Sequence, residues 1–418
     1  MRSRLLQFMD EHIYPAEATL AGQIASAPDP LSFEAPIMDE LKTAARAAGL
    51  WNLFLPEEHW GAGLSNLQYA PLAEIMGWSP ELAPEALNCA APDTGNMELL
   101  ALFGTPEQHE RWLTPLLEGT IRSCFSMTEP NVASSDASNI ETTIKREGDE
   151  YVINGHKWWS SGALRDRCEL LVVLGVTNPE AGPHQRHSMV LVPRATPGVD
   201  ILRATSVFGY GHESAGGHAE IVYNSVRVPA SYLLGTEGSG FAIAQARLGP
   251  GRIHHCMRLL GKAERALDLM CKRARSRVTF GKPLSEQGVV QEWIADARID
   301  IEQARLLVLK TAWLMDTVGN QGARIEIAAI KVVVPNVVCR ILDHAIQLFG
   351  GAGLSEDFPL AKFYADARFI RIGDGPDEVH RMSVARRELR RHEPAGPERS
   401  AAQDRGPVQD EVQDAHTH

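Results

Sequence analysis

The hydrophobic pattern of this 418-residue chain changes twice, from a helical repeat to strand-like runs and back to a helical repeat. Apolar residues recur every three or four positions from Ile37 to Ala48, as they do on the buried face of a helix. The run Leu170–Leu174 is apolar throughout, which is typical of a buried strand. A chain of this length can build two or three packed units. The pattern therefore predicts three units in the order helical, β, helical.

We predict an α+β fold with an N-terminal helical domain over residues 1–121, a middle antiparallel β-barrel or sandwich over residues 122–236, and a C-terminal four-helix bundle over residues 237–391. Three long stretches with one apolar face, and a fourth near Asp377, predict the helices of this bundle. Pro335 lies inside the third helix and predicts a kink or a break there. Residues 392–418 are poor in apolar residues and are predicted to be disordered.

The charge balance argues against two classes of partner. The chain carries 41 basic and 53 acidic residues, a formal net charge of −12, so neither nucleic acid nor an anionic membrane surface has electrostatic support. The first residues do not resemble a signal peptide, and no run approaches the roughly 18 apolar residues of a membrane span. The 6 cysteines lack C-x-x-C spacing, which indicates thiols in a reducing compartment. We therefore expect a cytoplasmic protein.

The segment from Phe125 to Gly162 carries the clearest functional signal. A turn of small polar residues, Met127–Asp136, offers hydroxyl and backbone N–H groups, and a predicted turn at Asn154-Gly155 leads into Trp159 and two serines. An indole beside hydroxyl groups can stack on a flat heterocycle such as a flavin, while the hydroxyls bond to its edge. A tryptophan pair in a strand is more often core packing, so this hypothesis depends on the neighbouring motifs.

Four blocks of the chain resemble the acyl-CoA dehydrogenase family, in the order and with the separations of that family. They are residues 125–162, Arg277–Leu284, Gln347–Leu354 and Asp366–His380. The resemblance covers roughly Leu31 to Leu389 and is greatest to the branch of acyl-CoA dehydrogenase 10 and 11 type proteins, described as acting on longer or branched acyl chains. It implies FAD-dependent oxidation of an acyl-CoA thioester to the trans-2-enoyl-CoA in fatty acid β-oxidation. Electrons would pass to an electron-transferring flavoprotein.

The resemblance also implies which residues contact the flavin. Met127 and Thr128 would meet its pyrimidine side, Trp159 its face, and Ser161 its edge at N5. Ser135 would contact a phosphate or the thioester arm of the substrate. Because the chain has one residue more than the family's usual spacing before this serine, Ser134 could take that role instead. Exposed hydroxyl and N–H groups in such a turn suit an anion.

Two further motifs are implied to complete the FAD site from a neighbouring subunit. Arg277 would pair with the pyrophosphate, a task that suits its forked guanidinium, with Phe280 packed nearby. Gln347, Gly350 and Gly351 would admit the adenine–ribose half of FAD, although on local grounds they form a glycine-capped helix end. A site shared in this way implies a homodimer or a homotetramer.

The resemblance implies that the catalytic base is Asp374, where most family members carry glutamate after tyrosine. A carboxylate must reach the α-hydrogen of the thioester while N5 of the flavin faces the β-carbon. The position that carries the base in some other members is Gly251, which offers no carboxylate. Arg252 would fix the Asp374 loop and contact the substrate together with Gly375. The backbone N–H of Asp374 would polarise the thioester carbonyl, and Gly373 would leave room for a substituted acyl chain.

Other interpretations of the same residues stay open. Asp374 could be an ordinary acidic turn residue in Asp-Gly-Pro-Asp. The same scaffold with an aspartate base occurs in nitroalkane-oxidising flavoproteins, and a catalytically silent partner could keep the fold as a docking surface. His184-x-x-His187 and His254-His255 lack further ligands at metal-binding spacing, so we predict that no metal is bound.

Overall fold

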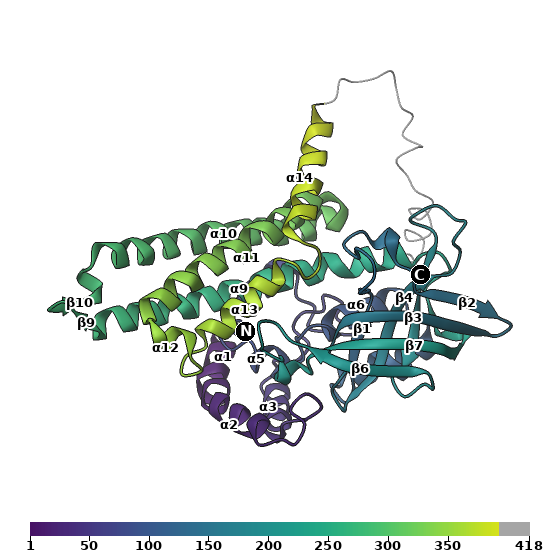
Figure 1. Ribbon diagram of the computed structural model, residues 1–418, viewed down its shortest axis with the longest axis horizontal. Coiled ribbons are helices and arrows are strands. Elements are labelled where there is room, and N and C mark those ends of the chain that lie inside the picture. The colour runs from purple at the N-terminus through teal and green to yellow at the C-terminus, as the bar shows by residue number, and fades with distance from the viewer. Residues whose placement is uncertain (393–418) are drawn as a thin grey trace.

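The computed structural model describes residues 1–392 and confirms the predicted order of helical, β and helical parts (Figure 1). The sheet lies at one end of the molecule, and the long C-terminal helices extend to the other end. Apart from His392, the predicted disordered tail lies outside the described residues. None of the helices within residues 1–392 is long and apolar enough to cross a membrane.

The N-terminal part consists of short helices joined by loops. They are α1 (Arg2–Phe8), η1 (Met9–Ile13), α2 (Tyr14–Ala25), α3 (Pro36–Ala47), α4 (Asn66–Met76), α5 (Ala83–Ala86), α6 (Asp93–Phe103), α7 (Pro106–Gln108), η2 (His109–Leu113) and α8 (Thr114–Leu117). The predicted helix after Ile37 is α3, and the chain leaves it through Gly49 at a φ of 64°. Thr105 and Gln108 form reciprocal capping bonds at the start of α7.

The middle part is one sheet of eight strands. They are β1 (Arg122–Ser126), β2 (Thr143–Glu147), β3 (Glu150–Ser161), β4 (Cys168–Val176), β5 (His187–Pro193), β6 (Val199–Thr205), β7 (His218–Pro229) and β8 (Leu233–Leu234). Their order is β6-β7-β3-β2-β4-β5-β8, with β1 beside β4. Most neighbours are antiparallel as predicted, but β1 runs parallel to β4, and β2 meets β4 in parallel at one residue pair. The sheet is therefore mixed.

Strand β3 continues through Asn154 and Gly155, where the sequence predicts a turn. The pairing register with β7 shifts at this point, so a bulge takes the place of the turn. The Oδ1 atom of Asn154 accepts a hydrogen bond from the N–H of Ser225 at 2.8 Å. A Cβ at position 155 would lie 2.2 Å from Oγ1 of Thr142, so the bulge requires glycine. Because β3 is not interrupted, Trp159 lies near the C-terminal end of the same strand.

The C-terminal part contains three long helices that pack side by side, as predicted. Its elements are α9 (Gly240–Ser276), β9 (Val278–Thr279), β10 (Lys282–Pro283), η6 (Leu284–Glu286), α10 (Gly288–Gly322), α11 (Arg324–Phe349), α12 (Gly351–Leu354), α13 (Leu360–Ile370) and α14 (Asp377–Arg391). The sequence missed α13, which packs on α9 and α11. Helix α11 is unbroken at Pro335, where the side chain of Asn336 donates a hydrogen bond to the Val332 carbonyl at 2.7 Å.

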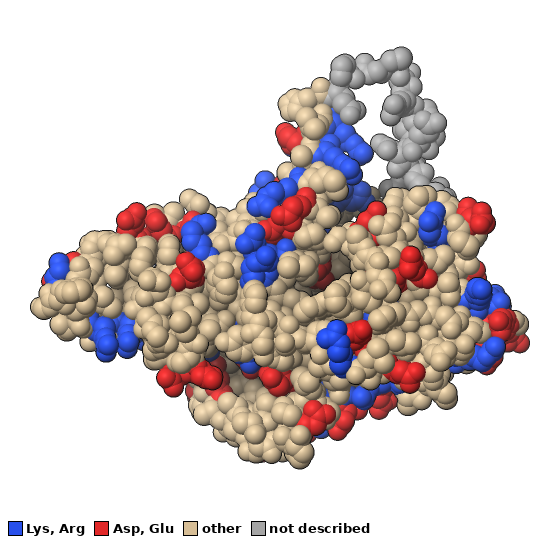
Figure 2. All heavy atoms as spheres, viewed as in Figure 1, with Lys and Arg blue, Asp and Glu red and all other residues tan. Residues whose placement is uncertain are grey.

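Helix α14 is the fourth helix expected near Asp377, and it projects from the body of the molecule (Figure 1). Basic side chains gather over this helix in the space-filling view (Figure 2). They are Arg381, Arg386, Arg387, Arg390 and Arg391. The first turn of α14 instead carries Asp377 and Glu378, as favoured by the positive end of a helix dipole.

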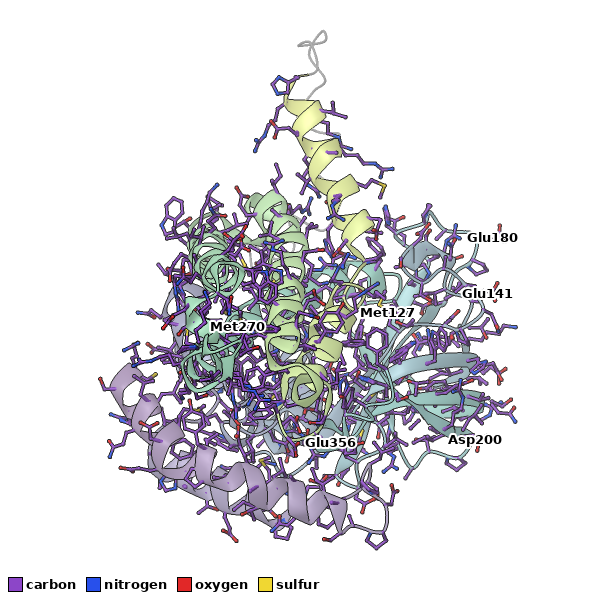
Figure 3. The ribbon with its side chains drawn as sticks, turned by 60° about the vertical axis from the view of Figure 1, so that its left-hand side comes forward. Met127, Glu141, Glu180, Asp200, Met270 and Glu356 are labelled. Carbon is purple, nitrogen blue, oxygen red and sulfur yellow. The ribbon has the colours of Figure 1, made fainter. Side chains whose placement is uncertain are left out.

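Two hydrophobic cores meet at strand β4. Leu170, Val172 and Leu174 belong to a core shared with the helical parts, whereas Leu171 and Val173 face a second core inside the β part. Since side chains alternate along a strand, β4 is buried on both faces. The turn after β1 lies at this junction, where Met127 packs against the shared core near the border of sheet and helices (Figure 3).

Candidate active site

Asp374 lies in the turn between α13 and α14 with a φ of 55°, which is uncommon for a residue other than glycine. Its backbone carbonyl accepts a hydrogen bond from Nε of Arg252 at 3.1 Å and lies 3.2 Å from Nε2 of His380. The carbonyl of the next residue, Gly375, accepts a hydrogen bond from Nζ of Lys331 at 3.2 Å. Groups from α9, α11 and α14 therefore fix this turn, and Arg252 contacts it as the resemblance implies.

The carboxylate of Asp374 is partly open, with 24% of the side chain exposed. Burial raises the pKa of this carboxyl, but the cationic groups of Arg247, Lys331 and Arg252 outweigh that effect and hold its pKa below the ordinary value. The group is therefore ionised at neutral pH and can accept a proton. The backbone N–H of Asp374 donates to no backbone carbonyl among residues 1–392.

His255 is a part of this site that sequence reasoning missed. Its Nε2 atom lies 3.5 Å from Oδ2 of Asp374. Burial, assisted by the charge of Arg258, lowers the pKa of His255 to about 3, so the ring is neutral near pH 7. A Cβ on Gly251 would lie 3.8 Å from the same Oδ2 atom. Residues four apart lie on the same face of a helix. Because Gly251 matches the position of the base in some family members, the sequence could have suggested that His255, on the same face, also lies in the site.

Trp159 and Ser161 lie at the end of β3 that faces α13. Trp159 has a φ of 52° at a register shift of the strand, a conformation that is a genuine outlier for a bulky residue and is often kept at functional sites. The Trp159 ring centroid lies 5.8 Å from that of Phe369 and 5.2 Å from that of His218. The Ser161 hydroxyl lies 2.8 Å from Nδ1 of His218. Trp159 and Ser161, the two predicted flavin contacts on β3, are both half-buried at this end of the strand.

The turn that contains Met127 and Thr128 is anchored to β3 by a buried lysine. Nζ of Lys157 donates to the Met127 carbonyl at 2.7 Å and pairs with Oε1 of Glu129 at 2.8 Å. The Thr128 carbonyl accepts a hydrogen bond from the Trp158 N–H at 2.9 Å. Burial lowers the pKa of Lys157 to about 8, against the opposing effect of Glu129. These bonds hold the predicted flavin turn beside Trp159.

The two candidate phosphate serines differ in their surroundings. The hydroxyl of Ser134 accepts a hydrogen bond from the Glu129 N–H at 2.9 Å and lies 3.2 Å from the Glu129 carbonyl, so it stabilises its own turn. Ser135 is exposed on the same turn. Ser135 is therefore open to a ligand from solvent, whereas the Ser134 hydroxyl is bonded within its turn. The choice between the two serines stays a prediction.

The remaining predicted FAD residues lie at the other end of the molecule. All are exposed, and they are Arg277 at the end of α9, Phe280 between β9 and β10, Gln347 in the last turn of α11, and Gly350 and Gly351 at the start of α12. Phe280 is 98% exposed and has a φ of 49°. Figure 1 shows that this tip of the helical part points away from the sheet. Within one chain the structure does not bring these residues together with Trp159 or Asp374.

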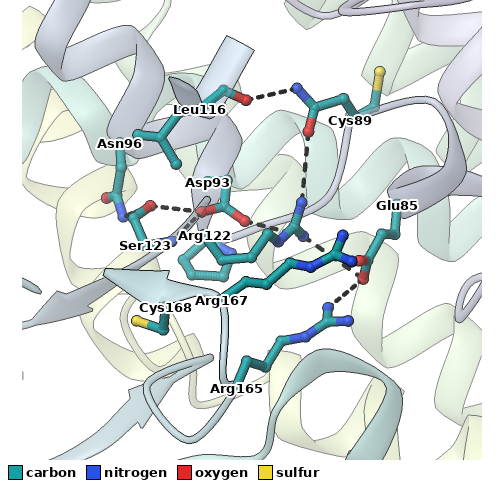
Figure 4. Close-up of polar contacts among 12 residues, drawn as sticks. Glu85, Cys89, Asp93, Asn96, Leu116, Arg122, Ser123, Arg165, Arg167 and Cys168 are labelled. Atoms are coloured by element: carbon teal, nitrogen blue, oxygen red, sulfur yellow. Dashed lines mark hydrogen bonds and ion pairs between the residues drawn. The ribbon is translucent and has the colours of Figure 1, made fainter. Parts of the chain in front are cut away.

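A cavity of about 190 Å³ lies where the three parts of the chain meet. Its lining includes Gly162 next to Ser161, His255 next to the Asp374 carboxylate, and Phe369. One wall consists of the buried ionic network of Figure 4, in which Arg122 pairs with Asp93 at 3.0 Å and Arg165 donates to Glu85 at 2.6 Å.

In that network burial raises the pKa of the Glu85 carboxyl, but Arg122, Arg165 and Lys42 lower it well below its ordinary value. Glu85 is therefore ionised, and its charge is balanced by the surrounding cations. Since Glu85 lies in α5 and Arg122 begins β1, these ion pairs fix the N-terminal helices to the sheet beside the cavity.

The aromatic and hydroxyl groups around Trp159 suit a flavin. They offer a half-buried indole face at Trp159, hydroxyls at Thr128 and Ser161, and an exposed hydroxyl at Ser135 for a phosphate. Hard or soft metal ions require a different set, and within residues 1–392 no three His, Cys, Asp or Glu side chains gather as ligands. The individual roles of these residues stay predictions.

Buried histidines around the site make stability sensitive to pH. Burial is the main cause that lowers the pKa of His218 and His255 to about 3 and that of His380 to about 4. In the unfolded chain these rings bind protons below about pH 6.5. The unfolded state therefore takes up more protons than the folded state as the pH falls from 6.5 to 4. For each of these histidines, the free energy of unfolding falls by about 1.4 kcal/mol per pH unit over this range.

We expect urea unfolding midpoints to be clearly lower at pH 5 than at pH 7. Replacing one buried ring, as in His218→Phe, should reduce this pH dependence, whereas the exposed His59→Gln should leave it as in the wild type. Equal midpoints at pH 5 and pH 7 would contradict this account of the buried histidines.

Comparison with protein families assigns almost the whole described chain. Residues 1–120 match the N-terminal domain, residues 124–226 the middle domain, and residues 238–389 the C-terminal domain of acyl-CoA dehydrogenase. Membership in this family supports FAD as the cofactor. The aromatic and hydroxyl groups around Trp159 agree with this cofactor.

Individual relatives agree with this assignment. The chain is 61% identical over 390 residues to the probable acyl-CoA dehydrogenase FadE2 of Mycobacterium tuberculosis, covering 93% of this chain and 95% of that protein. It is 56% identical to mouse acyl-CoA dehydrogenase family member 10, covering 94% of this chain but 37% of that longer protein. A solved Mycobacterium abscessus structure described as an acyl-CoA dehydrogenase is 51% identical, covers 93% of this chain and 97% of its own, and superposes with a TM-score of 0.91. The chain therefore belongs to the acyl-CoA dehydrogenase family.

Proposed function

We propose that this protein oxidises an acyl-CoA thioester to the trans-2-enoyl-CoA, with Asp374 as the base that removes the α-proton. The observation that carries the proposal is an ionised, partly open carboxylate, fixed by its backbone and bordered by free space at Gly251. FAD, when bound, supplies the acceptor for the hydride that leaves the β-carbon. The N–H of Asp374, which donates to no backbone carbonyl among residues 1–392, would donate to the thioester carbonyl and stabilise the enolate formed on proton removal.

We further propose how the chain orients its ligands. Trp159 packs on the face of the flavin, Ser161 meets its N5 edge, and the turn at Met127 and Thr128 meets its pyrimidine side. The exposed hydroxyl of Ser135 supports a contact to a phosphate. Electron-transferring flavoprotein as acceptor, a role in fatty acid β-oxidation and a cytoplasmic location are proposals of the same kind, and the 6 free cysteines support the last of them.

Incubation of the purified protein with acyl-CoA thioesters of several lengths, and an artificial electron acceptor, tests this function. Mass spectrometry of the products should find a loss of two hydrogens from at least one thioester. Oxygen consumption with nitroalkanes and no change in any thioester would instead favour nitroalkane oxidation. A colourless protein that takes up no added FAD would favour the catalytically silent scaffold.

We also propose a homodimer or homotetramer, because the FAD residues at the far tip need a second chain to meet Trp159. One face of α10 supports this proposal, since Ile299, Leu306 and Trp313 are exposed at intervals of seven residues. Such large apolar groups in a row are typical of a face covered by another helix.

We expect Leu306→Asp to weaken association of the subunits by roughly tenfold or more, because 67% of this side chain is exposed in one chain and would be buried in the assembly. Light scattering after size-exclusion chromatography measures the mass over a concentration series. Leu202→Asp, an exposed leucine on β6, is the matched control and should not change the mass. A monomeric wild type, or equal association in the wild type and Leu306→Asp, would contradict the proposal.

A further inference from the structure

A chain of hydrogen bonds leads from Ser161 into the protein, and the proposed flavin contact uses only its first member. The Ser161 hydroxyl lies 2.8 Å from Nδ1 of His218, and Nε2 of His218 lies 2.7 Å from Nδ1 of His212. The other nitrogen of His212, Nε2, lies 2.6 Å from Oδ1 of Asp366. Lys262 pairs with the second oxygen of Asp366. We call Ser161, His218, His212 and Asp366 the relay.

The relay is held in place by elements from three regions of the chain. Ser161 and His218 are paired neighbours on β3 and β7, while Asp366 projects from α13. His218 is 5% exposed and its ring lies 5.2 Å from Trp159 and 5.1 Å from Phe369. His212 adopts a left-handed conformation, with φ 55° and ψ 47°. This local strain persists with both ring nitrogens engaged, which indicates that the surroundings specify its position.

Charge decides which way the hydrogen bonds of the relay run. Burial raises the pKa of Asp366, but Lys262 and His212 lower it well below its ordinary value. Asp366 is therefore a carboxylate that only accepts hydrogen bonds. Burial lowers the pKa of His218 to about 3, so His218 is a neutral ring with one N–H.

The proton positions follow from these charges. Asp366 accepts from the Nε2–H of His212, and the same carboxylate also pairs with Lys262. We take His212 as the tautomer whose hydrogen is on Nε2, with Nδ1 free. The free Nδ1 of His212 then accepts from the Nε2–H of His218. That leaves Nδ1 of His218 as an acceptor, and the only hydrogen that Ser161 can supply to it is its hydroxyl proton.

We propose that the relay turns the Ser161 hydroxyl proton away from the flavin and thereby raises the reduction potential of the bound cofactor. The inference rests on the proposed function, because it takes Ser161 to face N5 of FAD. N5 of an oxidised flavin accepts hydrogen bonds, whereas N5 of the two-electron-reduced flavin carries a proton and donates. An oxygen that offers N5 only lone pairs stabilises the reduced form alone. His218, His212 and Asp366 are thus positioning residues.

The sign of the effect of Ser161→Ala tests the proposal. The midpoint potential of bound FAD is measured anaerobically at one pH for the wild-type and variant holoproteins. Loss of the acceptor should lower the potential by about 30 mV, which is a tenfold change in the equilibrium of a two-electron couple. If Ser161 instead donated to oxidised N5, the same variant would raise the potential. Ser161→Thr keeps the hydroxyl and should keep the wild-type potential.

A second variant tests the role of the relay. His218→Phe keeps a ring between Trp159 and Phe369 but frees the Ser161 hydroxyl to donate to oxidised N5, so it should also lower the potential. In the Ser161→Ala background, His218→Phe should add no further shift. An equal shift in both backgrounds would show that the effect does not pass through Ser161. Should His218→Phe fail to fold, the Ser161 variants decide alone.

The outcomes separate this proposal from the proposed function. A raised or unchanged potential in Ser161→Ala, with wild-type flavin still reduced by an acyl-CoA, overturns the relay and leaves the dehydrogenase proposal standing. The expected shifts with a flavin that no acyl-CoA reduces overturn the dehydrogenase proposal and leave the relay standing. A protein that takes up no FAD overturns both.

Discussion

Asp374→Asn is expected to lower kcat for acyl-CoA oxidation by roughly 10²- to 10⁴-fold, the contribution typical of a positioned general base. Asparagine has nearly the same shape but cannot accept the α-proton. The bonds that fix this turn, from Arg252 to the Asp374 carbonyl and from Lys331 to the Gly375 carbonyl, involve only the backbone and should persist. FAD content and acyl-CoA affinity should therefore stay close to those of the wild type, and steady-state kinetics with substrate-binding measurements separate the two effects.

A matched rescue variant makes this prediction sharper. A Cβ at Gly251 would lie 3.8 Å from Oδ2 of Asp374, at ordinary van der Waals distance. A glutamate there can direct its carboxylate to the same space, and glycine-to-glutamate favours the helix α9. Gly251→Glu combined with Asp374→Asn should recover at least about tenfold of the lost kcat. Retention of most activity in Asp374→Asn alone would exclude Asp374 as the base.

Lys157→Met is expected to destabilise the protein by roughly 3–5 kcal/mol and to reduce its FAD content. The Lys157 side chain is 0% exposed and bonds to Glu129 and to the Met127 carbonyl. Methionine fills a similar volume but leaves the Glu129 charge buried with three donors from Glu141 and Thr142 as its remaining partners. Urea unfolding measures the loss, and the flavin-to-protein absorbance ratio measures the cofactor.

The double variant Lys157→Met with Glu129→Gln is the control for this second prediction. Removing both charges eliminates the uncompensated buried carboxylate, so the double variant should be more stable than Lys157→Met by at least about 1 kcal/mol. If Lys157→Met unfolds at the wild-type urea concentration, the ion pair does not hold the turn as described. FAD retention at the wild-type level would show that the turn at Met127 does not depend on Lys157.

The sequence predicted the large features of this fold because they depend on local periodicity. The runs around Leu170 and Ile37 show on their own whether they form strand or helix, and both predictions are confirmed. The turn predicted at Asn154-Gly155 is wrong because pairing with β7 and the close approach of Thr142 favour a bulge in a continuous strand. A local turn signal does not report such tertiary contacts.

The candidate site was only partly predictable for the same reason. Family motifs pointed to Trp159 and Asp374, and the structure places both near the three-part junction in strained conformations. His255, Lys157 and the relay partners of Ser161 were missed, since their roles depend on partners distant in sequence. His212 contacts Asp366 across 154 positions, and Arg252 contacts Asp374 across 122. Periodicity and spacing do not encode these pairings.

The most direct test of the central claim is an anaerobic titration of the purified holoprotein with a panel of acyl-CoA thioesters, followed by its visible spectrum. We predict that at least one thioester bleaches the flavin band of the wild type and that Asp374→Asn, with the same FAD content, keeps its band oxidised over the same time. A wild-type flavin that stays oxidised with every thioester, or an Asp374→Asn flavin that bleaches as fast as the wild type, would contradict the account.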